Sequence, residues 1–494
     1  MKTYWIDLFC GAGGTSTGIH LAGVNTEVLA CVNHDAEAIK CHKKNHPNTV
    51  HFTEDIRDWN VIQKIKTLAD AIRIKDPDAI INIWASLECT HFSKAKGGMA
   101  RDADSRTLAE HLIRYVKEID PDYLYIENVR EFMSWGPLDA NMKPMSSKKG
   151  VDYEKWRDGI MNVGYNYDYQ LLNSADFGAY TSRERYFGVF GRKGLPITFP
   201  KQTHIRKKKL QNSGLKPWKS VKDLLDLQDE GRTIFGLTKM NRPYSDNTLK
   251  RILAGLHKFH KEGLFIKRYN GGNPNDKSQS VNAPLGTILC NRTHGLVKPV
   301  FLTSYYGNGG SNSVDEPLNT ITTKERHAAQ FIDYDYSSPT STDLDSVAGT
   351  ITTVPKHKLV SAQWIVDTQF SNKGRSIERP AQTLIAKMDK KPLYLISAPE
   401  KSQTNHTKVL STDSKTCIEI KNFMTQNKIA DIKIRMLHVE ELKSIQGFPD
   451  DYELTGTKTN QLKFIGNSVV PLMAQKLVES NFDSLFNKPK IVWL

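Results

Sequence analysis

Residues 1–195 alternate between short apolar runs typical of strands and longer patterns typical of helices. This alternation predicts an α/β fold built on a doubly wound, mostly parallel sheet. The expected strands are Thr3–Phe9, Glu27–Val32, Ala79–Ala85, Tyr123–Ile126, Tyr169–Leu172 and Tyr186–Phe190, and the expected helices include Ala36–Lys44, Val61–Ile74 and Thr107–Ile119. Such sheets bind ligands at the carboxyl ends of their strands, so functional residues are expected there.

The remaining sequence divides into two further segments. At 494 residues the chain is too long for one ordinary core, so more than one domain is expected. From 196 to 430 Pro and Lys are frequent at first, a helix is expected at Asn247–Lys261, and a long strand-and-turn region follows. Residues 431–494 return to helical periodicity. We therefore expect an α/β domain, 1–195 with 431–494, interrupted by a β-rich insert.

The insert contains an internal repeat. Its four phrases are Ala283–Ile288, Glu316–Ile321, Val347–Ile351 and Arg379–Leu384. Their threonines recur at intervals of 33, 30 and 33 residues: Thr287, Thr320, Thr350 and Thr383. Similar β-units could present polar loops to one extended ligand, such as a nucleic-acid backbone. A duplicated structural unit without a ligand is the alternative, and the sequence leaves both open.

Charge and cysteine usage narrow the class of protein. The formal net charge is +14, and nucleic acid is the commonest partner of such an excess, although a soluble protein can also simply be basic. The densest basic run, His204–Lys209, fits a solvated linker or a binding segment. No apolar run has the length of a membrane span, and no secretion leader is expected. Six scattered cysteines predict reduced thiols in the cytoplasm.

A glycine-rich turn follows the first expected strand. Gly11, Gly13 and Gly14 would let a ligand approach the backbone closely. Ser16 stands at the third glycine position of the dinucleotide pattern, which favours a smaller nucleoside cofactor, and a purely structural turn is the alternative. Two later groups of residues are placed to hold a ribose and an adenine amino group: Asn33, His34 and Asp35 at the end of the second strand, and Asp55 and Ile56 after the third.

Three further residues are candidates for catalysis. Cys89 lies in a polar loop just after a strand, which favours a nucleophile over a small buried hydrophobe. Glu127 ends an apolar strand, where a partly desolvated carboxylate suits a general acid, although a surface glutamate is also compatible. Arg183 and Arg185 alternate at the start of a strand, so one is expected to reach the site while the other holds phosphate or structure.

The other cysteines are interpreted as structural: Cys10, Cys31, Cys41, Cys290 and Cys417. The segment Cys41–His46 lacks a second pair of metal ligands, so no zinc site is expected.

Taken together, these motifs resemble the DNA (cytosine-5) methyltransferase family over about 1–195 and 431–494. The matching segments, in the family's order, are Asp7–Gly14, Cys89 with Phe92-Ser93, Glu127–Val129, Arg183–Arg185, Arg435–Glu440 with Gln446–Pro449, and Gly466–Pro471. The chain departs from the family at four places. Glu88-Cys89-Thr90 replaces Pro-Cys-Gln, Thr181 replaces a glutamine, Asn33 replaces the ribose-binding glutamate, and His34 replaces an aromatic residue.

The resemblance implies a Rossmann-like methyltransferase fold with a target-recognition insert at about 200–425. It also implies transfer of a methyl group from S-adenosylmethionine to C5 of a flipped cytosine in double-stranded DNA. Catalysis is assigned to Cys89, Glu127 and Arg185, with Arg183 and Ser93 on the DNA. The cofactor residues are Phe9, Gly11, Gly13, Gly14, Asn33, His34, Asp55, Ile56, Asn467 and Ser468.

By the same resemblance we expect no metal, no membrane, and a monomer acting on DNA in the cytoplasm of a bacterial or phage-infected cell, beside the nucleoid. A cognate restriction endonuclease is a further expected partner. Three alternatives stay open. They are the same chemistry on RNA, which the long insert disfavours, a catalytically silent DNA-binding relative, and a nicotinamide oxidoreductase, which leaves Glu127–Val129 unexplained.

Overall fold

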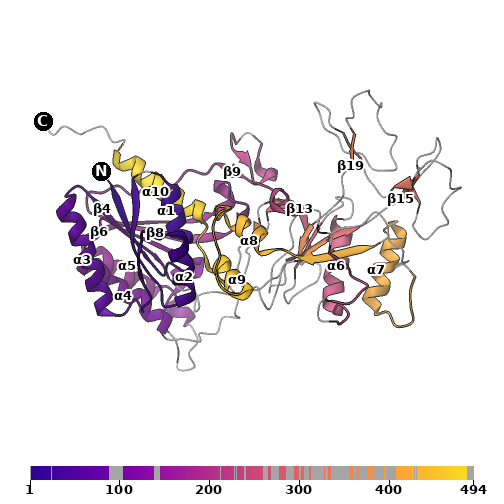
Figure 1. Cartoon of the computed structure of the whole chain (residues 1–494), viewed down its shortest axis with the longest axis horizontal. Coiled ribbons are helices and arrows are strands. Elements are labelled where there is room, and N and C mark those ends of the chain that lie inside the picture. Colours follow the sequence, from indigo (N-terminus) through magenta and orange to yellow (C-terminus); the bar gives the residue numbers. More distant parts are fainter. Residues whose placement is uncertain are drawn as a thin grey trace. The chain divides into compact units, whose positions relative to one another are not determined.

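The computed structural model describes most of the chain outside the insert and parts of the insert (Figure 1). The described residues are 2–23, 25–87, 104–137, 139, 145–211, 213–226, 229, 231–238, 241–259, 408–427, 429 and 431–486, together with strand segments between 265 and 396. The chain forms two compact units. The first comprises Met1–Lys219, Thr383–Ala386 and Leu442–Leu494, and the second comprises Ser220–Gln382 and Lys387–Glu441.

The first unit is built on a seven-stranded sheet with the order β3-β2-β1-β4-β5-β8-β6. The strands are β1 (Thr3–Leu8), β2 (Thr26–Val32), β3 (Val50–Phe52), β4 (Ile80–Ser86), β5 (Tyr123–Asn128), β6 (Tyr165–Asn173) and β8 (Glu184–Arg192). Strand β8 runs antiparallel to both of its neighbours, and the other strands run parallel to one another. The predicted α/β fold with a mostly parallel sheet is therefore confirmed.

Helices cover both faces of this sheet (Figure 1). One face packs on α3 (Trp59–Lys75), α4 (Asp104–Ile119) and α5 (Val151–Met161), and the other on α1 (Gly14–Leu21) and α10 (Pro471–Phe486). Successive side chains of β1 point to opposite faces of the sheet, which explains this division. Ile6 packs in the core with α3, α4 and α5, and Trp5 packs in the core with α1 and α10. Burying each such side chain stabilises the fold by roughly 1.5–3 kcal/mol.

The end of the chain returns to the first unit. Helices α8 (Val439–Gln446) and α9 (Lys458–Asn467) lead into α10, which packs along α1. Asn481 of α10 also accepts a hydrogen bond from the backbone N–H of Thr198 at 2.9 Å. This unit also contains helix α2 (Ala36–Asn45) and the short strands β7 (Thr181–Ser182), β9 (His204–Ile205) and β10 (Lys216–Pro217).

The second unit contains a sheet with the order β20-β23-β24-β14-β12-β13-β21, and β11 pairs with β24. These strands are β11 (Arg232–Thr233), β12 (Phe265–Arg268), β13 (Ser278–Pro284), β14 (His294–Pro299), β20 (Trp364–Val366), β21 (Ile377–Arg379), β23 (Tyr394–Ile396) and β24 (Ile432–Met436). Helices α6 (Asp246–Phe259) and α7 (Lys415–Gln426) pack on each other. Shorter strands are β15 (Leu302–Ser304), β16 (Ser311–Asn312), β17 (His327–Ala328), β18 (Ile332–Tyr334), β19 (His357–Leu359) and β22 (Ala381–Gln382).

Two strands of this sheet lie at the first and last repeat phrases. Strand β13 ends at Pro284 and pairs in parallel with β21, with Pro284 opposite Arg379. The two phrases therefore begin side by side. The repeat threonines Thr287, Thr320, Thr350 and Thr383 lie outside the described residues.

The late motif of the second unit is organised by a buried ion pair. Arg435 binds Glu441 through two hydrogen bonds of 2.8 and 3.0 Å, and both side chains are 6% exposed. The pair joins the end of β24 to the first turn of α8. Removing either partner would leave an unpaired charge in the interior, which is strongly destabilising.

In the part of the chain that the structure describes, no helix is long and apolar enough to cross a membrane.

Candidate active site

The turn after β1 adopts an unusual backbone conformation. Phe9, Gly11 and Gly13 have φ angles of 62°, 52° and 100°, which lie in the left-handed region that glycine tolerates best. A Cβ added at Gly11 would meet nothing within 4 Å. The backbone at Gly11 therefore borders open space, where a ligand can approach it.

The C-terminal motif packs against the same turn. A Cβ at Gly14 would collide with the Ser468 side chain and would lie 2.6 Å from the carbonyl oxygen of Val469. The Ser468 carbonyl accepts a hydrogen bond from Gln446 Nε2 at 2.9 Å. Asn467 ends α9 and is exposed. Segments from opposite ends of the chain thus meet at Gly14.

This contact predicts the effect of one added methyl group. Replacing Gly14 with alanine should lower the free energy of unfolding of the first unit by about 1–3 kcal/mol, because Ser468 or the Val469 backbone must move. The matched control is Gly159→Ala in α5, where the new Cβ would lie 3.6 Å from Ile113, an ordinary contact. Urea unfolding of both variants checks this, and equal small changes would contradict the close approach at Gly14.

The residues after β2 and β3 lie at the same edge of the sheet, because the two strands pair in parallel. Asn33 accepts a hydrogen bond from the backbone N–H of Asp35 at 2.8 Å, and His34 is exposed. Asp55 forms an ion pair with Arg57 at 2.6 Å, and hydrogen bonding from Arg57 lowers the pKa of Asp55.

Two neighbours of these residues are tied to helices. Ile56 is buried, and its carbonyl accepts a hydrogen bond from the Tyr115 hydroxyl at 2.9 Å. Asp35 accepts hydrogen bonds from the first turn of α2 and pairs with Lys463 of α9 at 2.6 Å. The β2–α2 connection is therefore held at Asp35, and the β3–α3 connection is held at Ile56.

Glu127 and Arg185 meet at the carboxyl end of β5. Arg185 Nε lies 3.1 Å from Glu127 Oε1, and the two side chains are 15% and 7% exposed. Glu127 is also the sheet neighbour of Ser86, the last residue of β4. The nearly buried Glu127 carboxylate therefore contacts the Arg185 guanidinium beside the carboxyl end of β4.

Arg183 occupies a different environment. Its side chain is buried, and Nη1 donates a hydrogen bond to the Gly466 carbonyl at 3.2 Å. Its backbone N–H donates to Ser174 Oγ at 3.2 Å. Of the two arginines, Arg185 reaches Glu127, whereas Arg183 joins the start of β8 to the C-terminal motif. Its predicted contact with DNA stays a prediction.

The predicted nucleophile loop lies outside the described residues. Residues 88–103 include both Cys89 and Ser93. Strand β4 ends at Ser86, the sheet neighbour of Glu127, and Cys89 follows Ser86 by three residues in the sequence.

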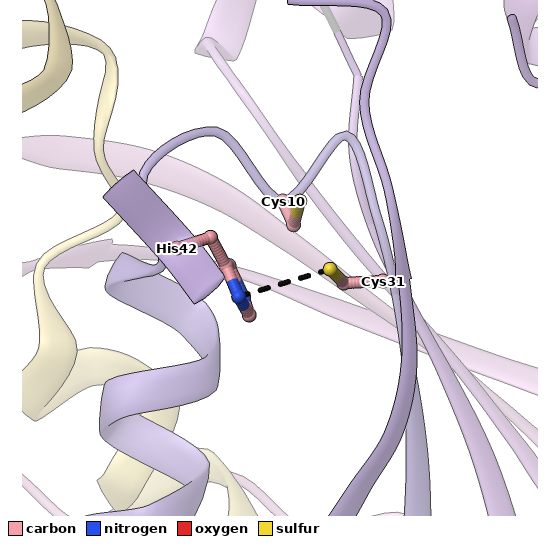
Figure 2. A group of neighbouring side chains, drawn as sticks. All are labelled: Cys10, Cys31 and His42. Atoms are coloured by element: carbon pink, nitrogen blue, oxygen red, sulfur yellow. Dashed lines mark hydrogen bonds between the residues drawn. The ribbon is translucent and has the colours of Figure 1, made fainter. Parts of the chain in front are cut away.

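Sequence reasoning missed a polar cluster beneath the glycine turn, where Cys10, Cys31 and His42 come together (Figure 2). Burial raises the pKa of the Cys10 thiol, and it also raises that of the nearby Asp7 carboxyl. For Cys31, hydrogen bonds with Cys10, His42 and His51 outweigh burial and lower the pKa. No fixed spacing in the sequence signals this group, because its members come from three different elements.

Comparisons with known proteins find several similar chains. A family model described as C-5 cytosine-specific DNA methylase matches residues 3–482. Type II methyltransferase M.AquIA of Picosynechococcus sp. is 30% identical over 236 residues, which are 46% of this chain and 88% of M.AquIA. Type II methyltransferase M.AgeI of Thalassovita gelatinovora is 24% identical over 508 residues, 97% of this chain and 99% of M.AgeI. The solved structure of a DNMT2 mutant from Spodoptera frugiperda covers 97% of this chain and 100% of its own, with 14% identity and a TM-score of 0.47.

Proposed function

The chain belongs to the C-5 cytosine-specific DNA methylase family, and from this premise we propose that it methylates C5 of a cytosine within a specific sequence of double-stranded DNA, using S-adenosylmethionine. The observation that carries the proposal is the pairing of Glu127 with Arg185 at the strand end next to β4. An acid and a cation therefore lie beside Ser86, three residues before Cys89 in the sequence, which supports the proposal.

The turn after β1 fits the proposed cofactor. The open space at Gly11 admits a ligand to the backbone, and the polar strand ends at Asn33 and Asp55 lie farther along the same edge. Phe9, Gly13 and Gly14 would shape this pocket, with His34, Ile56, Asn467 and Ser468 at its border. When bound, S-adenosylmethionine supplies an electrophilic methyl group.

The remaining chemistry belongs to side chains of the protein. C5 of cytosine is a poor nucleophile, so the Cys89 thiolate first adds to C6 while Glu127 protonates or hydrogen-bonds N3. The resulting enamine is nucleophilic at C5. After methylation, loss of the C5 proton and elimination of Cys89 restore the ring. Arg185 holds the Glu127 carboxylate and the cytosine O2.

Chain connectivity supports the role of Cys89. Cys89 follows Ser86 by three residues, and three extended residues reach at most about 11 Å. Ser86 is paired with Glu127 in the sheet.

A cytosine within a duplex cannot reach a site formed by Cys89, Glu127 and Arg185, so the target base must be flipped out of the helix.

The partner is DNA, as the net charge of +14 supports. Two exposed cations of the first unit would contact its backbone. Arg206 lies 4.8 Å from the centroid of the Trp218 ring, and Lys219 lies 5.0 Å from that of Tyr180. The enzyme would act as a monomer on the DNA of a bacterial or phage-infected cell. A restriction endonuclease of the same specificity would be its counterpart, as the type II relatives suggest.

The proposal is tested by transfer of a radiolabelled methyl group from S-adenosylmethionine. Label is expected in double-stranded DNA and not in tRNA, and bisulfite sequencing of DNA from an expressing host should find 5-methylcytosine at one recurring site. Label in tRNA alone would show an RNA enzyme. Absence of transfer to several genomic DNAs would instead indicate a silent DNA-binding relative.

A further inference from the structure

The cluster beneath the glycine turn is set up by the register of three parallel strands. Asp7 of β1 is the sheet neighbour of Cys31 in β2, and Cys31 is the neighbour of His51 in β3. Neighbours across a sheet project from the same face, so these side chains form a row. Cys10 lies in the turn after β1, and His42 extends from α2 toward Cys10 and Cys31 (Figure 2).

The donor atoms of this cluster are close together. Cys10 Sγ, Cys31 Sγ and a ring nitrogen of His42 all lie within 4.8 Å of one another, and all three residues are buried. Cys31 Sγ is 3.7 Å from His42 Nδ1. Tetrahedral zinc, with bonds of about 2.3 Å to sulfur and about 2.0 Å to nitrogen, would hold such atoms about 3.6 Å apart. The observed separation therefore matches two ligands of one ion.

The second ring nitrogen of His42 is oriented as in metal-binding histidines. His42 Nε2 lies 2.9 Å from Ser16 Oγ, and that hydroxyl donates to Asp7 Oδ2 at 2.7 Å. A ligating histidine commonly donates its free N–H into such a chain, which fixes the tautomer and increases the basicity of the ligand. With Nε2 protonated, His42 presents the lone pair of Nδ1 to the thiols.

His51 of β3 lies next to this group. Its Nε2 is 2.9 Å from His42 Nδ1, so one of the two rings donates a hydrogen bond to the other. A cation bound at His42 Nδ1 would take the place of this hydrogen bond.

We propose that Cys10, Cys31 and His42 bind one zinc-class divalent cation. Two thiolates and imidazole nitrogens are the ligands such ions prefer. The ion would connect the glycine turn with β2 and α2, so its role is structural and independent of the proposed methyl transfer. It would hold the segment that leads from Cys10 into Gly11, Gly13 and Gly14.

The test uses the full chain, stripped with a chelator and titrated with Co²⁺. Wild type should bind one ion per chain and develop the intense sulfur-to-cobalt charge-transfer absorption of a thiolate site. Cys31→Ser should lose this absorption and at least about tenfold in affinity. The matched control is Cys41→Ser, because Cys41 is equally buried in α2 but its Sγ faces the Glu453 carbonyl at 3.5 Å.

A second variant guards against misfolding of Cys31→Ser. Ser16→Ala removes only the partner of His42 Nε2, and should weaken Co²⁺ binding about 10–100-fold with unchanged circular dichroism. Bound Zn²⁺ should also raise the Tm of wild type and of Cys41→Ser. The proposal is overturned if wild type shows no charge-transfer band, or if Cys31→Ser and Ser16→Ala bind Co²⁺ as tightly as Cys41→Ser.

Discussion

Replacing Glu127 with glutamine should lower the rate of methyl transfer at saturating DNA by about 10²–10⁴-fold. The amide keeps the shape of the carboxylate but cannot deliver a proton to N3 of the base. It also deprives Arg185 of the charge that it contacts at 3.1 Å. Because DNA binding depends mainly on phosphate contacts, the dissociation constant should change little. Single-turnover kinetics and gel-shift titration measure the two quantities separately.

The matched control is Glu184→Gln, one residue before Arg185. Glu184 is exposed and pairs with Arg130 at 3.0 Å, and exposed ion pairs of this kind contribute little. Its transfer rate should therefore stay near that of wild type. If Glu127→Gln also kept the wild-type rate, Glu127 would not act on the base. A rate that fell equally in both variants would indicate a general effect of charge.

Replacing Cys89 with alanine should abolish methyl transfer, because no other group would activate C5 of the cytosine. A covalent trap adds a second readout. In DNA that carries 5-fluorocytosine, the fluorine cannot leave as the C5 proton does, so Cys89 stays bonded to C6. Wild type should form a denaturation-resistant complex with this DNA in the presence of S-adenosylmethionine, and Cys89→Ala should form none.

The control for this experiment is Cys417→Ala. Cys417 is a partly exposed thiol at the start of α7, where burial and the neighbouring Asp413 raise its pKa to about 11. A thiol of this kind stays protonated and unreactive at neutral pH. The Cys417→Ala variant should therefore form the denaturation-resistant complex with this DNA as well as wild type does. Transfer or trapping that survives in Cys89→Ala would exclude the thioether mechanism.

Much of the fold could be predicted from local sequence. The alternation that predicted strands at Thr3–Phe9 and Tyr123–Ile126 placed β1 and β5 within two residues of their observed ends. Strand β3 was expected only as the strand before Asp55, without bounds, because its three residues are too few to show a period of two. Much of the insert, including the repeat threonines, lies outside the described residues, so its expected role stays a prediction.

The candidate site was only partly predictable. The apolar run before Glu127 and the alternation of Arg183 with Arg185 identified the residue types and their strand end. The pattern could not show which arginine meets the acid. That choice follows from pairing between β5 and β8, which places Glu127 opposite Phe187, and from the C-terminal motif, whose Gly466 carbonyl engages Arg183.

By itself the sequence determined the order of strands and helices and the chemical groups at the strand ends, because hydrophobic period and turn chemistry are local properties. Only the tertiary structure decided which of those groups meet. The pairing of Glu127 with Arg185, the packing of Ser468 on Gly14, and the row of Asp7, Cys31 and His51 all depend on register and on contacts between distant segments. Such contacts are specified by the packing of the whole unit, so no stretch of sequence encodes them alone.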